Sequence, residues 1–143
     1  MEKLISLHKH WLKADALKEV AATKIEGDHG FKEGLLEFAE FHSSFARLSV
    51  FYGLIYVVVE GYKALKCTNP KVDELLSQED FVDALRLFRN STFHFQKELI
   101  PEKAMKFLEL PESENWIRAL HIAFKNFFEV ELQIKEIMDK INA

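Results

Sequence analysis

The sequence predicts an all-α fold, on three observations. Apolar residues recur at three- and four-residue spacing along most of the chain, which is the helical period. The 143 residues include only five Gly and three Pro, too few for the turns of an all-β fold. Apolar residues make up 48% of the chain and Phe occurs 13 times, so a packed aromatic core is expected. This length suits one domain, residues 1–143, and we expect an antiparallel bundle of four long helices plus one or two short ones.

The first two predicted helices form the N-terminal half of the chain. An apolar stripe beginning at Leu4 and Leu7 and ending at Ala21 predicts the first. After the breakers "EGDHG" at 26–30, a second helix is predicted over roughly Phe31–Lys66. From Leu48 to Val59 this segment is apolar around most of its circumference. A helix with so little polar face is normally central in a bundle or covered by another subunit, so this one is either core or dimer interface.

Capping signals predict the next two helices. Asn69 followed by Pro70 suggests an N-cap with proline at the first helical position, starting a short helix through "KVDELLSQ". Ser77, with Asp80 three residues later, resembles a capping box. That pair predicts a helix from near Gln78 to about Glu98.

Two more helices are expected in the C-terminal third. A short one is predicted over Glu102–Leu108, after the breaker "LIP" at 99–101. Ser113 then caps a last long helix, near Glu114–Ile141, with an apolar stripe that starts at Trp116.

Charge and composition narrow the possible partners and the cellular location. The net charge of −4 argues against a tight or processive RNA binder, so any nucleic-acid role must rest on a local site. The single cysteine, Cys67, excludes an intrachain disulfide. The N-terminus has no apolar signal-peptide core. The uncharged run Leu48–Val59 would span only about 18 Å as a helix, too short for a bilayer. We expect a soluble cytoplasmic protein with no membrane contact.

Metal and cofactor motifs are absent from the sequence. Neither Glu37 nor Glu40 stands three residues before His42, so the Glu-x-x-His pairs of di-iron bundles are missing. His8 and His10 point in nearly opposite directions on a helix. Phosphate-binding glycine loops are also missing. We therefore predict no cofactor and no metal. His121, between apolar neighbours, is interpreted as a core or rim histidine.

The stretch Arg89-Asn90-Ser91-Thr92-Phe93-His94 contains most of the candidate chemistry. Histidine titrates near neutrality and serves as an acid or a base. Arginine stays charged and offers a planar fork to phosphate oxygens. Asn90 and His94, four apart, would share a helical face, whereas Arg89 and His94 are about 140° apart around an ideal helix. Arg89 must therefore reach around the helix or act across a twofold axis.

Arginine, four residues and histidine, with a polar residue directly after the arginine, resembles the signature of the HEPN family of small helical bundles. In that family two motifs from two subunits form one composite cleft. The resemblance implies a homodimeric, metal-independent endoribonuclease, a toxin or antiviral element, that leaves 2′,3′-cyclic phosphate and 5′-hydroxyl ends. His94 would transfer protons, Arg89 would stabilise the transition state, and Asn90 would position the phosphate or His94. Arg86 would extend the cationic face and bind the substrate. Glu60, which stands where the second helix could meet the motif helix, is a second candidate for substrate binding.

The same resemblance suggests partners and leaves alternatives open. Family members paired with a nucleotidyltransferase antitoxin have a Tyr two residues after the histidine, where this chain has Gln96. One alternative is a non-catalytic HEPN-like module that binds a nucleotide or a protein, and another is a plain structural or interaction bundle. Arg86 is better interpreted as part of a solvated stripe, paired with Asp83 or Gln96.

Overall fold

The computed structural model describes residues 1–21 and 33–143, and within them the chain forms seven α-helices and no strand. The prediction of an all-α fold is therefore confirmed for these residues. The predicted turn at 26–30 and the expected start of the second helix at Phe31 lie outside them. The helices are α1 (Glu2–Val20), α2 (Glu33–Ala64), α3 (Pro70–Leu76), α4 (Glu79–Phe93), α5 (Glu102–Leu108), α6 (Ser113–Glu131) and α7 (Ile134–Ile141).

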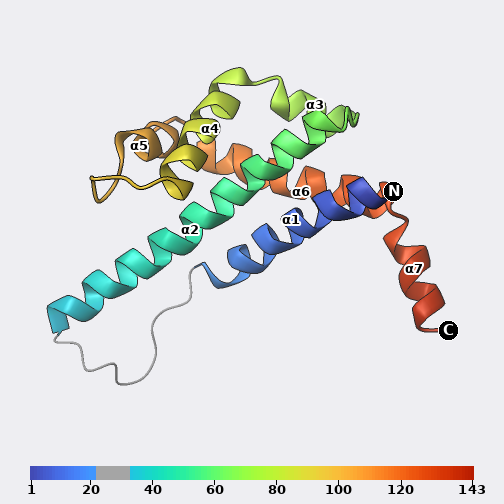
Figure 1. The fold of residues 1–143 in the computed structure, drawn as a ribbon, viewed down its shortest axis with the longest axis horizontal. Coiled ribbons are helices and arrows are strands. Elements are labelled where there is room, and N and C mark those ends of the chain that lie inside the picture. Colours follow the sequence, from blue (N-terminus) through green and yellow to red (C-terminus); the bar gives the residue numbers. More distant parts are fainter. Residues whose placement is uncertain (22–32) are drawn as a thin grey trace.

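Helices α1 and α2 lie side by side and run in opposite directions (Figure 1). Leu7, near the start of α1, faces Gly61, near the end of α2, so closely that a Cβ on Gly61 would collide with the Leu7 side chain. At the other end Ala21 shares a cleft with Phe41 and Phe45 of α2. The glycine thus leaves room for the Leu7 side chain, which would have to move if Gly61 had a Cβ atom.

The core is aromatic and centres on the second half of α2. Tyr52 packs edge-on against Phe88 of α4 and Phe107 of α5, and Tyr62 packs in the same way against Phe124 and Phe127 of α6. Such edge-to-face pairs stabilise beyond the area that they bury. The apolar run in α2 is therefore largely core, which is the first of the two predicted alternatives, core or dimer interface. The fully buried large side chains are Phe88, Phe107, Phe124, Phe128, Ile55, Leu85, Ile117 and Leu120.

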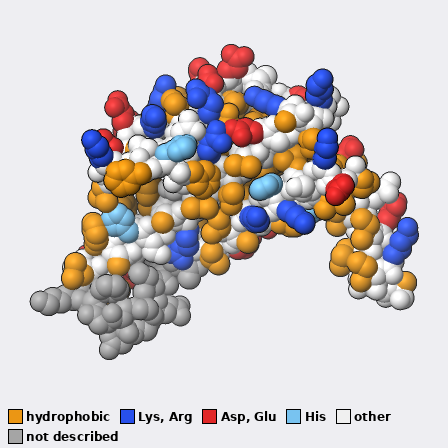
Figure 2. Space-filling model, viewed as in Figure 1, with side chains coloured by type: hydrophobic (Ala, Val, Ile, Leu, Met, Phe, Trp, Pro, Cys, Tyr) orange, Lys and Arg blue, Asp and Glu red, His pale blue; other side chains and the backbone are white. Residues whose placement is uncertain are grey.

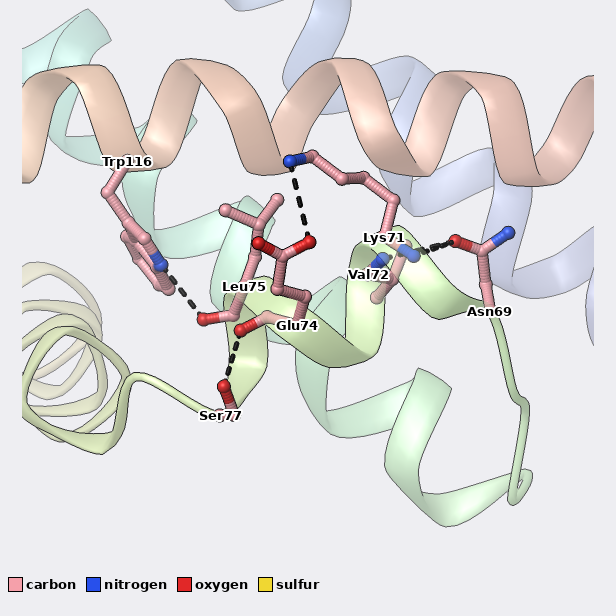
Figure 3. Close-up of polar contacts among 7 residues, drawn as sticks. All are labelled: Asn69, Lys71, Val72, Glu74, Leu75, Ser77 and Trp116. Atoms are coloured by element: carbon pink, nitrogen blue, oxygen red, sulfur yellow. Dashed lines mark hydrogen bonds and ion pairs between the residues drawn. The ribbon is translucent and has the colours of Figure 1, made fainter.

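Helix α3 starts as the sequence predicts and is tied to α6 (Figure 3). The Asn69 side chain accepts hydrogen bonds from the backbone N–H groups of Lys71 and Val72, at 3.0 and 3.1 Å, and Pro70 is the first helical residue. The indole N–H of Trp116 donates to the Leu75 carbonyl at 3.0 Å. The end of a short helix is thereby held on the core.

The predicted capping box at Ser77 is wrong. The Ser77 hydroxyl donates backwards to the Glu74 carbonyl, so this serine closes α3 instead of opening α4 (Figure 3). Gln78 precedes α4, and its side chain makes no capping hydrogen bond. A serine between two helices separated by two residues can serve either end, and the sequence alone does not decide which.

The motif helix is shorter than predicted. Helix α4 ends at Phe93, not at Glu98. The hydroxyls of Ser91 and Thr92 both donate to the Phe88 carbonyl, at 2.7 and 3.1 Å. Such side-chain bonds compete with the helical ladder in the last turn, and His94 follows in extended conformation, with φ −118° and ψ 146°.

The last predicted helix is two helices. Gln133 has a left-handed φ of 49°, which ends the run of α-helical hydrogen bonds and separates α6 from α7. The predicted cap is also wrong, because Ser113 is the first helical residue and the preceding Glu112 makes no side-chain capping bond. In Figure 1, α7 extends away from the other helices.

Helix α2 is long and apolar enough to cross a membrane, judged by length and composition over Gly34–Ala64, and 44% of its most apolar window is buried inside the protein. Core helices of soluble proteins meet the same criterion, so the length and composition of α2 do not distinguish a membrane-spanning helix from a core helix. The predicted cytoplasmic location stays a prediction.

Candidate functional site

The central contact of the candidate site joins α4 to α2. Arg89 places Nη2 2.6 Å from the Oε1 atom of Glu60, and its guanidinium carbon lies 5.0 Å from the centre of the Tyr56 ring. Both partners are on α2, one turn apart, so a single face of that helix holds the guanidinium by charge and by its aromatic surface. The Arg89 Nε atom is buried and has no hydrogen-bond partner in the described part of the chain.

The electrostatics around Tyr56 place Arg86 near the same group. Burial raises the pKa of Tyr56, and the carboxylate of Glu60 raises it further, while Arg86 and Arg89 act in the opposite direction. Arg86 is exposed, in keeping with its interpretation as part of a solvated face. Figure 2 shows Lys and Arg side chains gathered over α4 on the face in view, with a histidine beside them.

His94 lies just beyond the end of α4 and is exposed. Its backbone N–H donates to the Asn90 carbonyl at 3.2 Å, and its own carbonyl accepts from the Gln96 amide at 3.4 Å. Within the described residues its imidazole makes no hydrogen bond or ion pair. Because His94 is extended rather than helical, it does not share a helical face with Asn90 as the spacing predicts. Asn90 is partly exposed in the last turn of α4.

His94 and Arg89 lie beside different features of α2. His94 lines a pocket together with Ser49 of α2, whereas Arg89 lies against Tyr56 and Glu60. From Ser49 to Tyr56 the helix rises about 10 Å. Arg89 does not line the pocket of His94. The structure brings Arg89 and Glu60 together, and among the described residues no hydrogen bond or ion pair joins the His94 side chain to either of them.

The pocket beside His94 has a volume of about 280 Å³ and lies between α2 and the segment that follows α4. Its walls are mostly apolar and include Phe45, Val50 and Pro101. Ser49 is among the lining residues, and its hydroxyl oxygen is buried and has no hydrogen-bond partner within residues 1–21 and 33–143. An unpaired buried hydroxyl has free capacity both to donate and to accept.

Two residues of this region, Ser49 and Tyr56, are missing from the residues that the sequence singles out. Both lie in the apolar run "LSVFYGLIYVVV" at 48–59, which contains only one serine. A lone hydroxyl in such a run is a usable signal, because a buried polar group needs a partner. Tyr56 gives no comparable signal, since its contact with Arg89 depends on how α4 packs on α2.

In residues 1–21 and 33–143, no three His, Cys, Asp or Glu side chains are grouped so that they could hold a metal ion. Comparison of the chain with protein-family models, curated proteins and solved structures gives no match. The case for a function therefore rests on the residues themselves.

Proposed function

We propose that this chain is a metal-independent endoribonuclease of HEPN type, which folds as a HEPN-like antiparallel bundle and cleaves RNA at a composite site between two copies. The observation that supports it best is the state of His94. Its imidazole is exposed and unpartnered among the described residues, and Phe93 and Phe95 on either side are 46% and 90% exposed. Exposed aromatic rings on which bases stack are a recurrent means of holding single-stranded RNA.

In this proposal His94 moves protons between the 2′-hydroxyl, the phosphate and the leaving 5′-oxygen, producing a 2′,3′-cyclic phosphate and a 5′-hydroxyl. Arg89 balances charge on the phosphorane, and Asn90 positions the phosphate or His94. Arg86 adds positive charge near the RNA backbone. Glu60 acts through Arg89, whose side chain it orients, and this replaces the direct substrate contact that the sequence suggests for it.

Within one chain Arg89 is paired with Glu60 and does not line the pocket beside His94, and this is the reason for a second copy in this proposal. An arginine from one protomer and a histidine from its partner would complete a site that neither chain forms alone. Beyond the aromatic pair, Leu99 of the same segment is 61% exposed. An apolar group of this kind around a catalytic residue favours an interface over bare solvent.

We further propose that the protein acts in the cytoplasm as a toxin or antiviral element, regulated by an antitoxin partner such as a nucleotidyltransferase. The acceptor tyrosine of that regulation has no counterpart here, since Gln96 occupies its position. Regulation by modification of that residue is therefore not part of the proposal.

The proposal is tested with a labelled structured RNA in the presence of a chelator, comparing wild type with His94→Ala. We expect cyclic-phosphate ends from the wild type and a loss of about 10² to 10⁴ in rate for the variant. His42→Ala is the matched control, because His42 is partly exposed, lies against Phe38 and Phe41, and does not line the pocket beside His94. Equal cleavage by wild type and His94→Ala would contradict the assignment of His94.

A second candidate function, nucleotide or protein binding without cleavage, is favoured by the Arg89–Glu60 contact. A guanidinium whose charge is balanced by a carboxylate at 2.6 Å has less charge to offer a phosphorane. No cleavage by well-folded wild type, together with retained nucleotide binding, would select this function.

A further inference from the structure

The pocket beside His94 has the properties of a binding site rather than of a packing defect. Ser49 is one of the residues that line the pocket and is only 7% exposed, and its hydroxyl oxygen is buried with no hydrogen-bond partner among the described residues. Leaving a buried hydroxyl unpaired costs free energy, so a ligand that completes its hydrogen bonding would recover that cost. The two other hydroxyls that line the pocket, on Ser91 and Thr92, already donate to the Phe88 carbonyl.

The charges around the pocket select the chemistry of the ligand. Among the described residues that line it there is no Lys or Arg, and Glu98 contributes a carboxylate. A phosphate group would therefore be repelled from the interior. The walls formed by Phe45, Val50 and Pro101 are apolar, and they suit the faces of a flat ring whose polar edge reaches Ser49.

The size of the pocket sets the extent of the ligand. At about 280 Å³ it lies just below the range of pockets that enclose drug-sized molecules. It is therefore suited to a single heteroaromatic ring rather than to a whole nucleotide. The Gln96 side chain also lines the pocket, and its amide offers both a donor and an acceptor to a ring edge.

The geometry points to a nucleobase-binding pocket: the ring of one RNA base enters between α2 and the segment after α4, with its edge on Ser49 and its sugar and phosphate outside, at His94. This inference rests on the proposed ribonuclease function and adds base preference to it. The base held in the pocket is the one whose phosphate is presented to His94, so the pocket selects where the RNA is cut.

Binding is measured separately from cleavage, so that the two proposals can fail independently. The probes are the four nucleoside 3′-monophosphates, titrated by saturation-transfer NMR into the full chain, with ribose 5-phosphate as the control that lacks a ring. We expect one base to bind best and ribose 5-phosphate not to bind.

Two variants test the location of the ring. Ser49→Ala removes the unpaired hydroxyl and should weaken binding of the preferred nucleotide about threefold to tenfold. Ala46→Leu adds bulk at a pocket-lining position that is exposed, so it should block the pocket without disturbing the core. Ser43→Ala, on the same helix but outside the pocket, should bind as the wild type does.

A second arm separates an RNA base from a free nucleotide as the ligand. An eight-nucleotide RNA that is methylated at every 2′-oxygen cannot be cleaved, and it should bind more tightly than the monophosphate and displace it. Equal affinity of the two would overturn the assignment to RNA in favour of a free nucleotide. Unchanged binding by Ala46→Leu, or no binding of any of the four nucleotides at millimolar concentration, would overturn the pocket itself, whether or not the protein cleaves RNA.

Discussion

Arg89 and Glu60 join α4 to α2 through atoms 2.6 Å apart, and the guanidinium also covers the Tyr56 ring. The pair is partly open to solvent, with 24% of the Arg89 side chain and 44% of the Glu60 side chain exposed. Solvent therefore screens the pair, and its contribution to the free energy of unfolding is small. The contact of the guanidinium with the Tyr56 ring adds to this contribution.

We predict a coupling free energy of about 0.5 to 1 kcal/mol between these two side chains. It is measured by urea unfolding of wild type, Glu60→Gln, Arg89→Gln and the double variant. The coupling should shrink in 1 M salt, because screening weakens partly exposed pairs. Additive effects of the two substitutions at low salt would show that the contact does not stabilise the fold.

Tyr62 joins α2 to α3 by a hydrogen bond from its hydroxyl to Asp73 Oδ1 at 2.7 Å, and burial together with this carboxylate raises the pKa of Tyr62. Tyr62→Phe removes a hydrogen bond to a charged acceptor, so the free energy of unfolding should fall by about 1 to 2 kcal/mol. Tyr52→Phe is the matched control, since its hydroxyl makes no hydrogen bond to any of the residues that the structure describes. Equal losses for the two variants in urea would contradict the role assigned to Asp73.

His121 should make stability depend on pH. Its ring is 4% exposed and stacks on Trp11, with Nε2 3.1 Å from Asp15 Oδ1. Burial lowers the pKa of His121 below its ordinary 6.5, and Lys18 and Lys125 lower it further, while Asp15 opposes them. As pH falls below 6.5 the unfolded chain takes up the proton first, so stability is lost with falling pH until the folded-state pKa is passed.

The expected slope is up to about 1.4 kcal/mol per pH unit over that interval. It is obtained by urea unfolding between pH 7.5 and pH 5, comparing wild type with His121→Phe, which keeps a ring against Trp11 but does not titrate. Burial also lowers the pKa of His8, and its contribution has the same sign in both proteins. An identical pH profile for wild type and variant would show that His121 is not the source.

Gly61→Ala should destabilise the protein although alanine is the better helix former. The new methyl group would collide with the Leu7 side chain across the α1–α2 contact. Overpacking of a core costs about 1 to 3 kcal/mol, and we expect so close a collision to cost more than the gain of about 1 kcal/mol in helix propensity. Gly34→Ala, whose Cβ would meet nothing within 4 Å, should be neutral or stabilising. A rise in the melting temperature of Gly61→Ala would contradict this prediction, because it would mean that the Leu7 side chain moves aside at little cost.

The sequence predicts the helices well where local chemistry decides them. Asn69 and Pro70 start α3, and α5 covers Glu102–Leu108, as predicted. Prediction failed where a hydroxyl could bond in either direction. Ser77 ends α3 instead of starting α4. The hydroxyls of Ser91 and Thr92 donate to the Phe88 carbonyl near the end of α4, which ends earlier than predicted.

Within the candidate site, the spacing in the sequence identifies Arg89, Asn90 and His94. It does not predict which residues they contact or which backbone conformation His94 adopts. The partner of Arg89 on α2 is 29 residues away in sequence, and the conformation of His94 depends on a helix end that the pattern places too late. Both features come from packing between helices, which periodicity does not report.

The two tryptophans each donate the indole N–H to a backbone carbonyl of another helix: Trp11 to His121 and Trp116 to Leu75. One contact docks α1 on α6, and the other docks α3 on α6. Each fluorophore therefore reports a separate interface from inside the native chain. Emission from single-tryptophan variants would follow the detachment of α1 and of α3 independently, and would show whether partner binding loosens one end of the molecule before the other.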